Sequence, residues 1–217
     1  MPSRAFSLAA LRAEVAGRLS GGGDDRQRES ARSRLRHIEA VAATVHDIGR
    51  AGNWPDATVE AAVRAAWIHD ALKLEGEAAW RARIEAAGEE PDPWATAQQP
   101  ELLHAQAATV WAAERGEVDR FVLAAVRHHP TAHPGWETVG RLLYVADFAE
   151  PTRNHAERAD AATLRALAGQ GGEGLSLAAR RVLAIRLRHF LGLGRAIHPD
   201  SWRAWKTWTD GERQVGK

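Results

Sequence analysis

Apolar residues recur at spacings of three and four along almost the whole chain, and no segment alternates between apolar and polar positions as a strand would. Alanine and leucine, which favour helices, are abundant. The pattern therefore predicts an all-α protein. The predicted helices cover residues 6–19, 26–50, 56–73, 76–86, 100–115, 117–128, 136–150, 160–168, 176–191 and 200–208.

Glycine and proline mark the breaks between these helices. Three glycines at 21–23 separate the first two, and Pro55 opens the third with Asp56 as its expected cap. Residues 89–93 are predicted to form a loop. The glycine-rich stretch 169–174 is predicted to be a linker, because a phosphate-cradling loop would follow a strand and none precedes it.

Several histidines and aspartates interrupt apolar helical segments. His69 and Asp70 end the apolar run 61–68, and Asp147 lies within the apolar run 142–147. Burying such a group without a partner costs roughly 2–7 kcal/mol, and more when it is charged. A single buried histidine is usually a satisfied core residue, but several on the inner faces of different helices favour a metal site in a helical core. The others are His37, His104, His128 and His129.

Composition narrows the chemistry of such a site. The chain has ten histidines and no cysteine, so any ligands must be nitrogen and oxygen atoms. Mixed imidazole and carboxylate ligands suit Fe, Mn, Co or Ni, and Zn less distinctively. His69 is expected to bind one ion while the Asp70 carboxylate spans two, at a separation of roughly 3.5–4 Å.

A second His-Asp pair, His46-Asp47, is predicted to have no metal role. It lies nine residues after His37 on the same helix, which is two and a half turns, so the two histidines point to opposite faces. The remaining histidines fall in loops or polar surroundings and are expected to be exposed or structural. They are His133, His155, His189 and His198.

The length and the net charge of the chain limit the classes of protein to which it can belong. The 217 residues suit one domain, with an N-terminal helix and glycine-rich linker at 1–25, a metal-binding core at 26–153 and C-terminal helices at 154–217. The net charge of +1 argues against a nucleic-acid binder. No run approaches the ~20 apolar residues of a membrane span. We expect a cytoplasmic protein that does not bind membranes, with a homodimer left open.

The order of these residues resembles a known family. A histidine, a His-Asp pair and a later aspartate in an apolar helix resemble the HD-domain metal-dependent phosphohydrolases. Over residues 8–206 the chain is similar to the YqeK-type branch, the symmetrical bis(5'-nucleosyl)-tetraphosphatases. The similar segments are Arg34-x-x-His37-x-x-x-Val41, His69-Asp70-Ala71-Leu72-Lys73, Leu102-Leu103-His104-Ala105, Ala125-Val126-Arg127-His128-His129, 144–153 (Tyr-Val-Ala-Asp-Phe-Ala-Glu-Pro-Thr-Arg) and 198–205 (His-Pro-Asp-Ser-Trp-Arg-Ala-Trp).

The resemblance implies a single HD-domain helical bundle with a binuclear metal centre in its core. It implies hydrolysis of diadenosine tetraphosphate to two ADP, with iron as the expected metal and Mn, Co, Ni or Mg as alternatives. Of the adjacent histidines, His129 rather than His128 falls on the family's ligand. The implied metal ligands are His37, His69, Asp70, His104, His129 and Asp147.

The resemblance also implies roles in catalysis and substrate binding. Asp70 would orient the attacking water, and Lys73 would face the polyphosphate, as would Arg127 and Arg153. A structural salt bridge is an equal alternative for each of these three cations. Thr131 and Trp136 lie in a loop expected to border the substrate. In that loop the family usually has Thr-[Thr/Ser]-Gly after the histidine and methionine at the position of Trp136, so substrate preference is the less secure expectation.

Three other functions stay open on the sequence. One is an HD phosphohydrolase for a nucleoside monophosphate, a cyclic nucleotide or an alarmone. Another is a nucleotide-binding regulatory module with little turnover, which the altered loop favours. The third is a purely structural helical protein. Trp202, Trp205 and Trp208 form a stripe that is expected to dock on the body of the domain.

Overall fold

The computed structural model describes residues 7–20, 22–152 and 160–215, and within these ranges it contains helices and no strand. This confirms the all-α prediction. The elements are α1 (Leu8–Leu19), α2 (Asp25–Ala51), α3 (Asp56–Ile68), α4 (Glu77–Ala86), α5 (Pro93–Gln98), the 3₁₀ turn η1 (Pro100–Leu102), α6 (Leu103–Glu114), α7 (Arg120–His128), α8 (Thr138–Ala149), α9 (Ala161–Ala168), α10 (Gly172–Gly192) and α11 (Pro199–Val215).

Two helices, α6 and α8, are buried on nearly every side. In α8 all residues from Val139 to Ala149 are buried except Arg141, and in α6 the first ten residues are buried. A helix that is apolar all round can be stable only where other helices surround it. Accordingly α8 packs against α2, α3, α7, α9 and α10, and Asp147 is thereby carried into the middle of the molecule.

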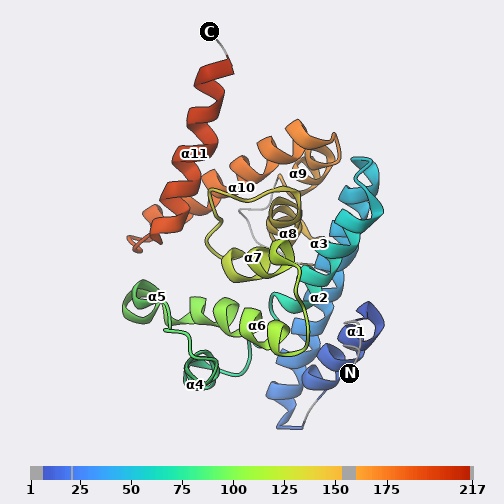
Figure 1. Cartoon of the computed structure of the whole chain (residues 1–217), viewed down its shortest axis with the longest axis vertical. Coiled ribbons are helices and arrows are strands. Elements are labelled where there is room, and N and C mark those ends of the chain that lie inside the picture. The colour runs from blue at the N-terminus through green and yellow to red at the C-terminus, as the bar shows by residue number, and fades with distance from the viewer. Residues whose placement is uncertain (1–6, 21, 153–159, 216–217) are drawn as a thin grey trace.

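The two ends of the chain lie on the outside of this core. Helix α1 packs on α2 and α3 through Leu11, Val15 and Leu19. Helix α11 packs on α10 and then runs away from the body, towards the top of Figure 1. No helix in the described part of the chain is long and apolar enough to cross a membrane.

Four boundaries differ from the prediction. Helix α3 ends at Ile68 rather than at 73, and its cap is Pro55, with Asp56 as the first helical residue. The predicted helix 100–115 begins as a 3₁₀ turn, because Pro100 and Gln99 set a non-helical start. The predicted helix 200–208 extends to 215. Helix α5 was not among the predicted helices; the Asp92 carboxylate starts it by accepting a hydrogen bond from the Ala95 N–H at 2.8 Å.

The glycine-rich linker is shorter than predicted, because Gly172 to Gly174 form the start of α10. The turn falls at Gly171, whose φ of 87° suits glycine. At Gly174 a Cβ atom would lie 2.2 Å from the Leu167 carbonyl oxygen, so α9 and α10 meet where only glycine fits.

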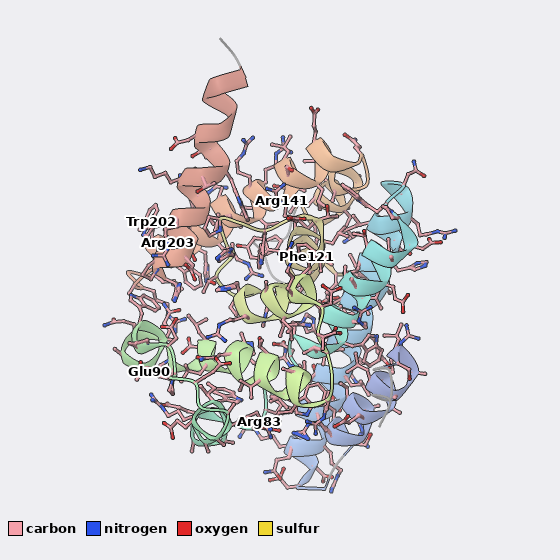
Figure 2. The ribbon with its side chains drawn as sticks, viewed as in Figure 1. Arg83, Glu90, Phe121, Arg141, Trp202 and Arg203 are labelled. Atoms are coloured by element: carbon pink, nitrogen blue, oxygen red, sulfur yellow. The ribbon has the colours of Figure 1, made fainter. Side chains whose placement is uncertain are left out.

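The tryptophan stripe docks only in part. Trp205 and Trp208 pack against the core, and the Trp208 ring stacks on Trp136 at 6.3 Å between centroids. Trp202 is 45% exposed and lies at the outer edge of the molecule beside Arg203 (Figure 2). The expectation was wrong for Trp202, because a spacing of three falls 60° short of a full turn at each step.

Candidate metal centre

Six buried histidines and aspartates from five helical segments converge at the centre of the fold, and each is at most 5% exposed. Two are helix C-caps, at the ends of α3 and α7, and one lies in the turn that follows α3. The others lie within α2, α6 and α8. They are His37, His69, Asp70, His104, His129 and Asp147, the residues that the family resemblance implies as metal ligands.

The ligand atoms form two groups that share Asp70. In the first group, His37 Nε2 lies 3.4 Å from His69 Nε2 and 3.2 Å from Asp147 Oδ1. Asp70 Oδ2 lies 3.7 Å from both of these imidazole nitrogens. These spacings are those of atoms that share one cation.

The second group uses the other oxygen of the same carboxylate. Asp70 Oδ1 lies 3.1 Å from His104 Nε2 and 3.6 Å from His129 Nε2. The two histidine nitrogens are 3.2 Å apart. Asp70 therefore stands between two sets of imidazoles, with one oxygen facing each set.

The outer nitrogens of the four histidines fix which ring atom faces inwards. Each Nδ1 lies against an oxygen that can only accept a hydrogen bond, so Nδ1 carries the proton and Nε2 presents its lone pair to the centre. The acceptors are the Glu150 carboxylate at 3.2 Å for His37, and the backbone carbonyls of Ala66 at 2.6 Å for His69, Glu101 for His104 and Val126 at 2.8 Å for His129.

Three of these acceptors come from helix ends, which explains how the local sequence builds the site. The carbonyls in the last turn of a helix have no intrahelical partner. His69 and His129, as C-caps, turn their imidazoles back onto the carbonyl three residues earlier. The residues that end α3 and α7 are thus also the ones whose imidazoles are oriented by the helix end.

Burial favours the neutral form of three of these histidines. It lowers the pKa of His69 to about 3, and it lowers the pKa values of His104 and His129 as well. For Asp70, burial opposes ionisation, but the neighbouring imidazoles hold the pKa well below its usual value. Neutral imidazoles and ionised carboxylates are the forms that bind metal ions.

The donor set therefore fits a metal centre. Nitrogen and oxygen atoms of four imidazoles and two carboxylates face one buried volume, and two groups of three of them lie within 4.8 Å of one another. Burying so many hydrogen-bond acceptors together would cost several kcal/mol per group unless cations bound them. The oxygen and nitrogen ligands match those of Fe, Mn, Co or Ni.

Two arginines orient the carboxylates. Arg34, one turn before His37 on α2, pairs with Asp70 Oδ2. Arg186 of α10 donates from Nη2 to Asp147 Oδ2 at 2.8 Å, and its guanidinium lies 4.7 Å from the Tyr144 ring centroid. Outer contacts of this kind hold ligands in position and tune the metal.

Lys73 lies at the edge of the second group. Its Nζ is 3.0 Å from His104 Nδ1 and 3.5 Å from the Glu101 carbonyl oxygen. Burial lowers the pKa of its ammonium group, against the opposite influence of the nearby Asp70 carboxylate. It is thus a half-buried cation beside the ligands.

The predicted substrate residues lie further out. Arg127 pairs with Glu89 at 2.8 Å, and Thr131 is buried with its hydroxyl 3.1 Å from the Ala132 carbonyl oxygen. Trp136 is 5% exposed and packs within the core. Arg153 lies outside the described residues. Their substrate roles stay predictions.

The other histidines stand apart from the centre. His128 turns away from His129 and pairs with Asp200 at 3.3 Å. His46, with Asp47, is exposed as predicted. His198 pairs with Asp92 at 3.3 Å. His155 lies outside the described residues. The geometry thus separates His129 from His128 in the way that the resemblance implied.

Three residues of the site were missed by reasoning from the sequence. Arg34 and Glu150 carried a usable signal, because each lies three residues, about one turn, from a ligand on the same face. Arg186 carried none, because it comes from α10, 39 residues beyond Asp147.

Two cavities border the centre. One, of about 920 Å³, includes His37 and Arg34 in its lining. The other lies beside Arg127, His128 and Thr131 and has a volume of about 40 Å³.

A solved structure from Clostridium acetobutylicum, described as a predicted HD superfamily hydrolase involved in NAD metabolism, matches this architecture. The TM-score is 0.74 over 91% of this chain and 96% of that one, at 20% identity. The chain has the HD-domain fold. Its buried histidines and aspartates include two groups that could hold a metal ion.

A sequence match adds to this likeness. Over 55 residues, 25% of this chain, the HD domain is 40% identical to the symmetrical bis(5'-nucleosyl)-tetraphosphatase of Bacillus subtilis strain 168. The match spans 30% of that protein's length. No family model matches the chain. The two similarities together support the HD-domain, YqeK-type family.

Proposed function

We propose that this protein is a metal-dependent phosphohydrolase that cleaves diadenosine tetraphosphate symmetrically to two ADP. The observation that carries the proposal is the position of Asp70, whose two carboxylate oxygens each face a separate pair of neutral histidines. One carboxylate between two ligand sets is the arrangement needed to hold two metal ions close together.

Metal ions held there would lower the pKa of a bound water and stabilise the charge that develops on a phosphoryl group. The residues that would hold them are His37, His69, Asp147 and one oxygen of Asp70 on one side, and His104, His129 and the other oxygen of Asp70 on the other.

The cations at the rim would meet the substrate's negative charge. Arg34 lines the larger cavity and already pairs with Asp70, so its guanidinium stands where the site opens. Lys73 lies beside His104 at the same centre. Arginine and lysine next to a phosphoryl group stabilise the charge of the transition state.

The choice of diadenosine tetraphosphate as the substrate is supported by the relative from Bacillus subtilis, which is named a symmetrical bis(5'-nucleosyl)-tetraphosphatase. The other HD-domain substrates, namely a monophosphate, a cyclic nucleotide or an alarmone, would use the same centre. A regulatory module that binds nucleotide with little turnover would share it too. Products from a panel of these substrates separate the candidates.

The decisive experiment uses a control that the chain itself supplies. Protein loaded with Fe(II) or Mn(II) is incubated with diadenosine tetraphosphate, and products are resolved by anion exchange. Asp70→Ala is compared with Asp47→Ala, which alters the exposed His-Asp pair on α2. We expect ADP as sole product, a loss of at least about 10³-fold in Asp70→Ala, and full activity in Asp47→Ala.

Other outcomes are equally informative. ATP plus AMP would contradict symmetrical cleavage while retaining the metal centre. Tight nucleotide binding without product would favour the regulatory module. No product and no bound metal after anaerobic purification would favour a structural protein.

A further inference from the structure

The cavity at His37 continues into a second cavity beneath α1. The first has a volume of about 920 Å³ and the second about 570 Å³. Both are lined by Arg26, Ser30 and Leu74, so they meet at these residues. Each is of the size that holds a small ligand. Together they form one groove, here called the α2 groove, that leads away from the metal centre.

One face of α2 forms the wall of this groove. Arg26, Ser30, Arg34 and His37 follow one another at spacings of four, four and three, which places them on the same side of the helix. At 1.5 Å per residue the face runs about 16 Å from His37 to Arg26. The groove is therefore long enough to take more than a phosphate group.

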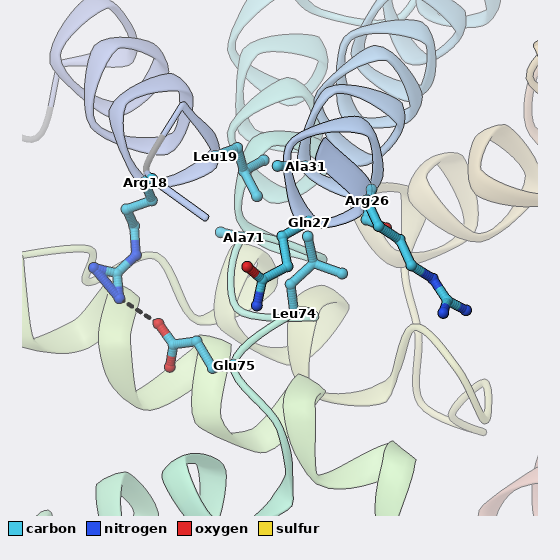
Figure 3. Close-up of a pocket in the computed structure, with 10 residues that line it drawn as sticks. Arg18, Leu19, Arg26, Gln27, Ala31, Ala71, Leu74 and Glu75 are labelled. Carbon is cyan, nitrogen blue, oxygen red and sulfur yellow. Dashed lines mark hydrogen bonds and ion pairs between the residues drawn. The ribbon is translucent and has the colours of Figure 1, made fainter. Parts of the chain in front are cut away.

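The chemistry of the groove changes along its length. Near the metal centre it has Arg34 and the Ser33 hydroxyl, which suit phosphate and sugar oxygens, and Asp25 and Glu29 also line this cavity. The apolar residues that line the far cavity are Leu19, Ala31, Ala71 and Leu74, with Arg18, Gln27 and Glu75 among its polar residues (Figure 3). This end suits an apolar ring.

Two residues at the junction have room for a ligand. Leu74 is 48% exposed, although the flanking Ala71 and Leu72 are buried. Arg26 makes no ion pair with any residue that the structure describes, whereas Arg18 across the groove pairs with Glu75. The exposed Leu74 side chain could contact an apolar ring, and the guanidinium of Arg26 could pair with a phosphate attached to that ring.

The cavity beside Thr131 is much smaller. Its volume of about 40 Å³ is near that of a single water molecule in the liquid, so a nucleoside cannot enter it without movement of the protein. Of these cavities, the two that form the α2 groove have room for a nucleoside.

We propose that the α2 groove binds one nucleoside diphosphate half of the dinucleotide, with its phosphates at Arg34 and its nucleoside over Leu74. This rests on the proposed function and names the site for one end of that substrate. In it, Arg26, Ser30 and Leu74 are binding residues that set the preference for a nucleoside.

The test measures binding of ADP and of pyrophosphate to Mn(II)-loaded protein by titration calorimetry. Leu74→Ser removes the apolar surface, and Ser30→Trp fills the junction of the two cavities. The matched controls are Leu191→Ser, an exposed leucine on α10, and Arg32→Trp, on α2 but outside both cavities. We expect ADP affinity to fall about ten-fold or more in the two groove variants, with pyrophosphate affinity unchanged and both controls like wild type.

Hydrolysis of diadenosine tetraphosphate in the same wild-type preparation separates the two proposals. If the wild type hydrolyses it and the groove variants keep their ADP affinity, the groove inference is overturned and the proposed function stands. An equal loss of pyrophosphate affinity would also overturn it, because the effect would then act at the metal centre. If the wild type neither hydrolyses the dinucleotide nor binds ADP, both proposals fail.

Discussion

At the scale of single residues, the site depends on which nitrogen of each imidazole faces inwards. Carbonyls and one carboxylate hold the four Nδ1 atoms, so the four Nε2 atoms converge on Asp70 and Asp147. A neighbour in the sequence can therefore have an entirely different environment. His128 and His129 are adjacent, yet His128 pairs with Asp200 outside the centre.

This contrast gives a prediction for metal content. His129→Ala should remove one of the three ligands of the second group and lower the stoichiometry from about two ions per chain to about one. His128→Ala, the matched control, should keep both ions. Metal content after anaerobic purification and desalting, measured by mass spectrometry, checks this. Equal metal loss in both variants would contradict the assignment of His129.

At the scale of elements, helix ends and helix contacts place these residues. The C-caps of α3 and α7 bring His69 and His129 to the centre, and the all-apolar α8 carries Asp147 there. Helix α10 then supplies Arg186, so the packing of α9 and α10 on α8 contributes to the site. The contact between α9 and α10 depends on Gly174.

Gly174→Ala should weaken that contact. Its Cβ would lie 2.2 Å from the Leu167 carbonyl oxygen, so α9 and α10 would have to separate, at a cost of about 1–3 kcal/mol in the free energy of unfolding. Gly192→Ala, on the same helix with no atom within 4 Å of the added group, is the control. Urea unfolding followed by circular dichroism measures both. A Gly174→Ala protein as stable as the control would show that the helices adjust freely.

At the scale of the whole molecule, the centre links helices that are far apart in the chain. Ligands come from α2, the end of α3, α6, the end of α7 and α8, and bound ions would therefore tie most of the core together. A ligand that binds only the folded state stabilises it by an amount that grows with the logarithm of the free ligand concentration relative to the Kd.

Removal of metal should therefore lower the Tm. At a free metal concentration of 100 times the Kd, binding contributes about 2.7 kcal/mol, and a chelator should abolish this contribution. Readdition of Mn(II) or Fe(II) should restore the Tm of the wild type. Differential scanning calorimetry of wild type and Asp70→Ala measures the shift, and the variant should show almost none. A wild-type Tm that does not respond to metal would argue that the acceptors are satisfied within the protein.

The sequence by itself determined the helical class, because spacings of three and four set which faces are apolar. It also determined which histidines and aspartates break those faces, while the choice of His129 over His128 came from the family resemblance. Two expectations from the sequence failed although their causes are local. Helix α5 depends on one capping carboxylate, and Trp202 is exposed because the stripe drifts around α11.

Only the tertiary structure decided how these residues meet. The two groups around Asp70, the pairing of Arg186 with Asp147 and the groove from His37 to Leu74 join segments tens of residues apart. Periodicity describes one helix at a time and carries no information on which helices touch. The position of Asp70 between two histidine pairs follows from packing α2, α3 and α7 on the buried helix α8, with α6 packed in turn on α7 and α3.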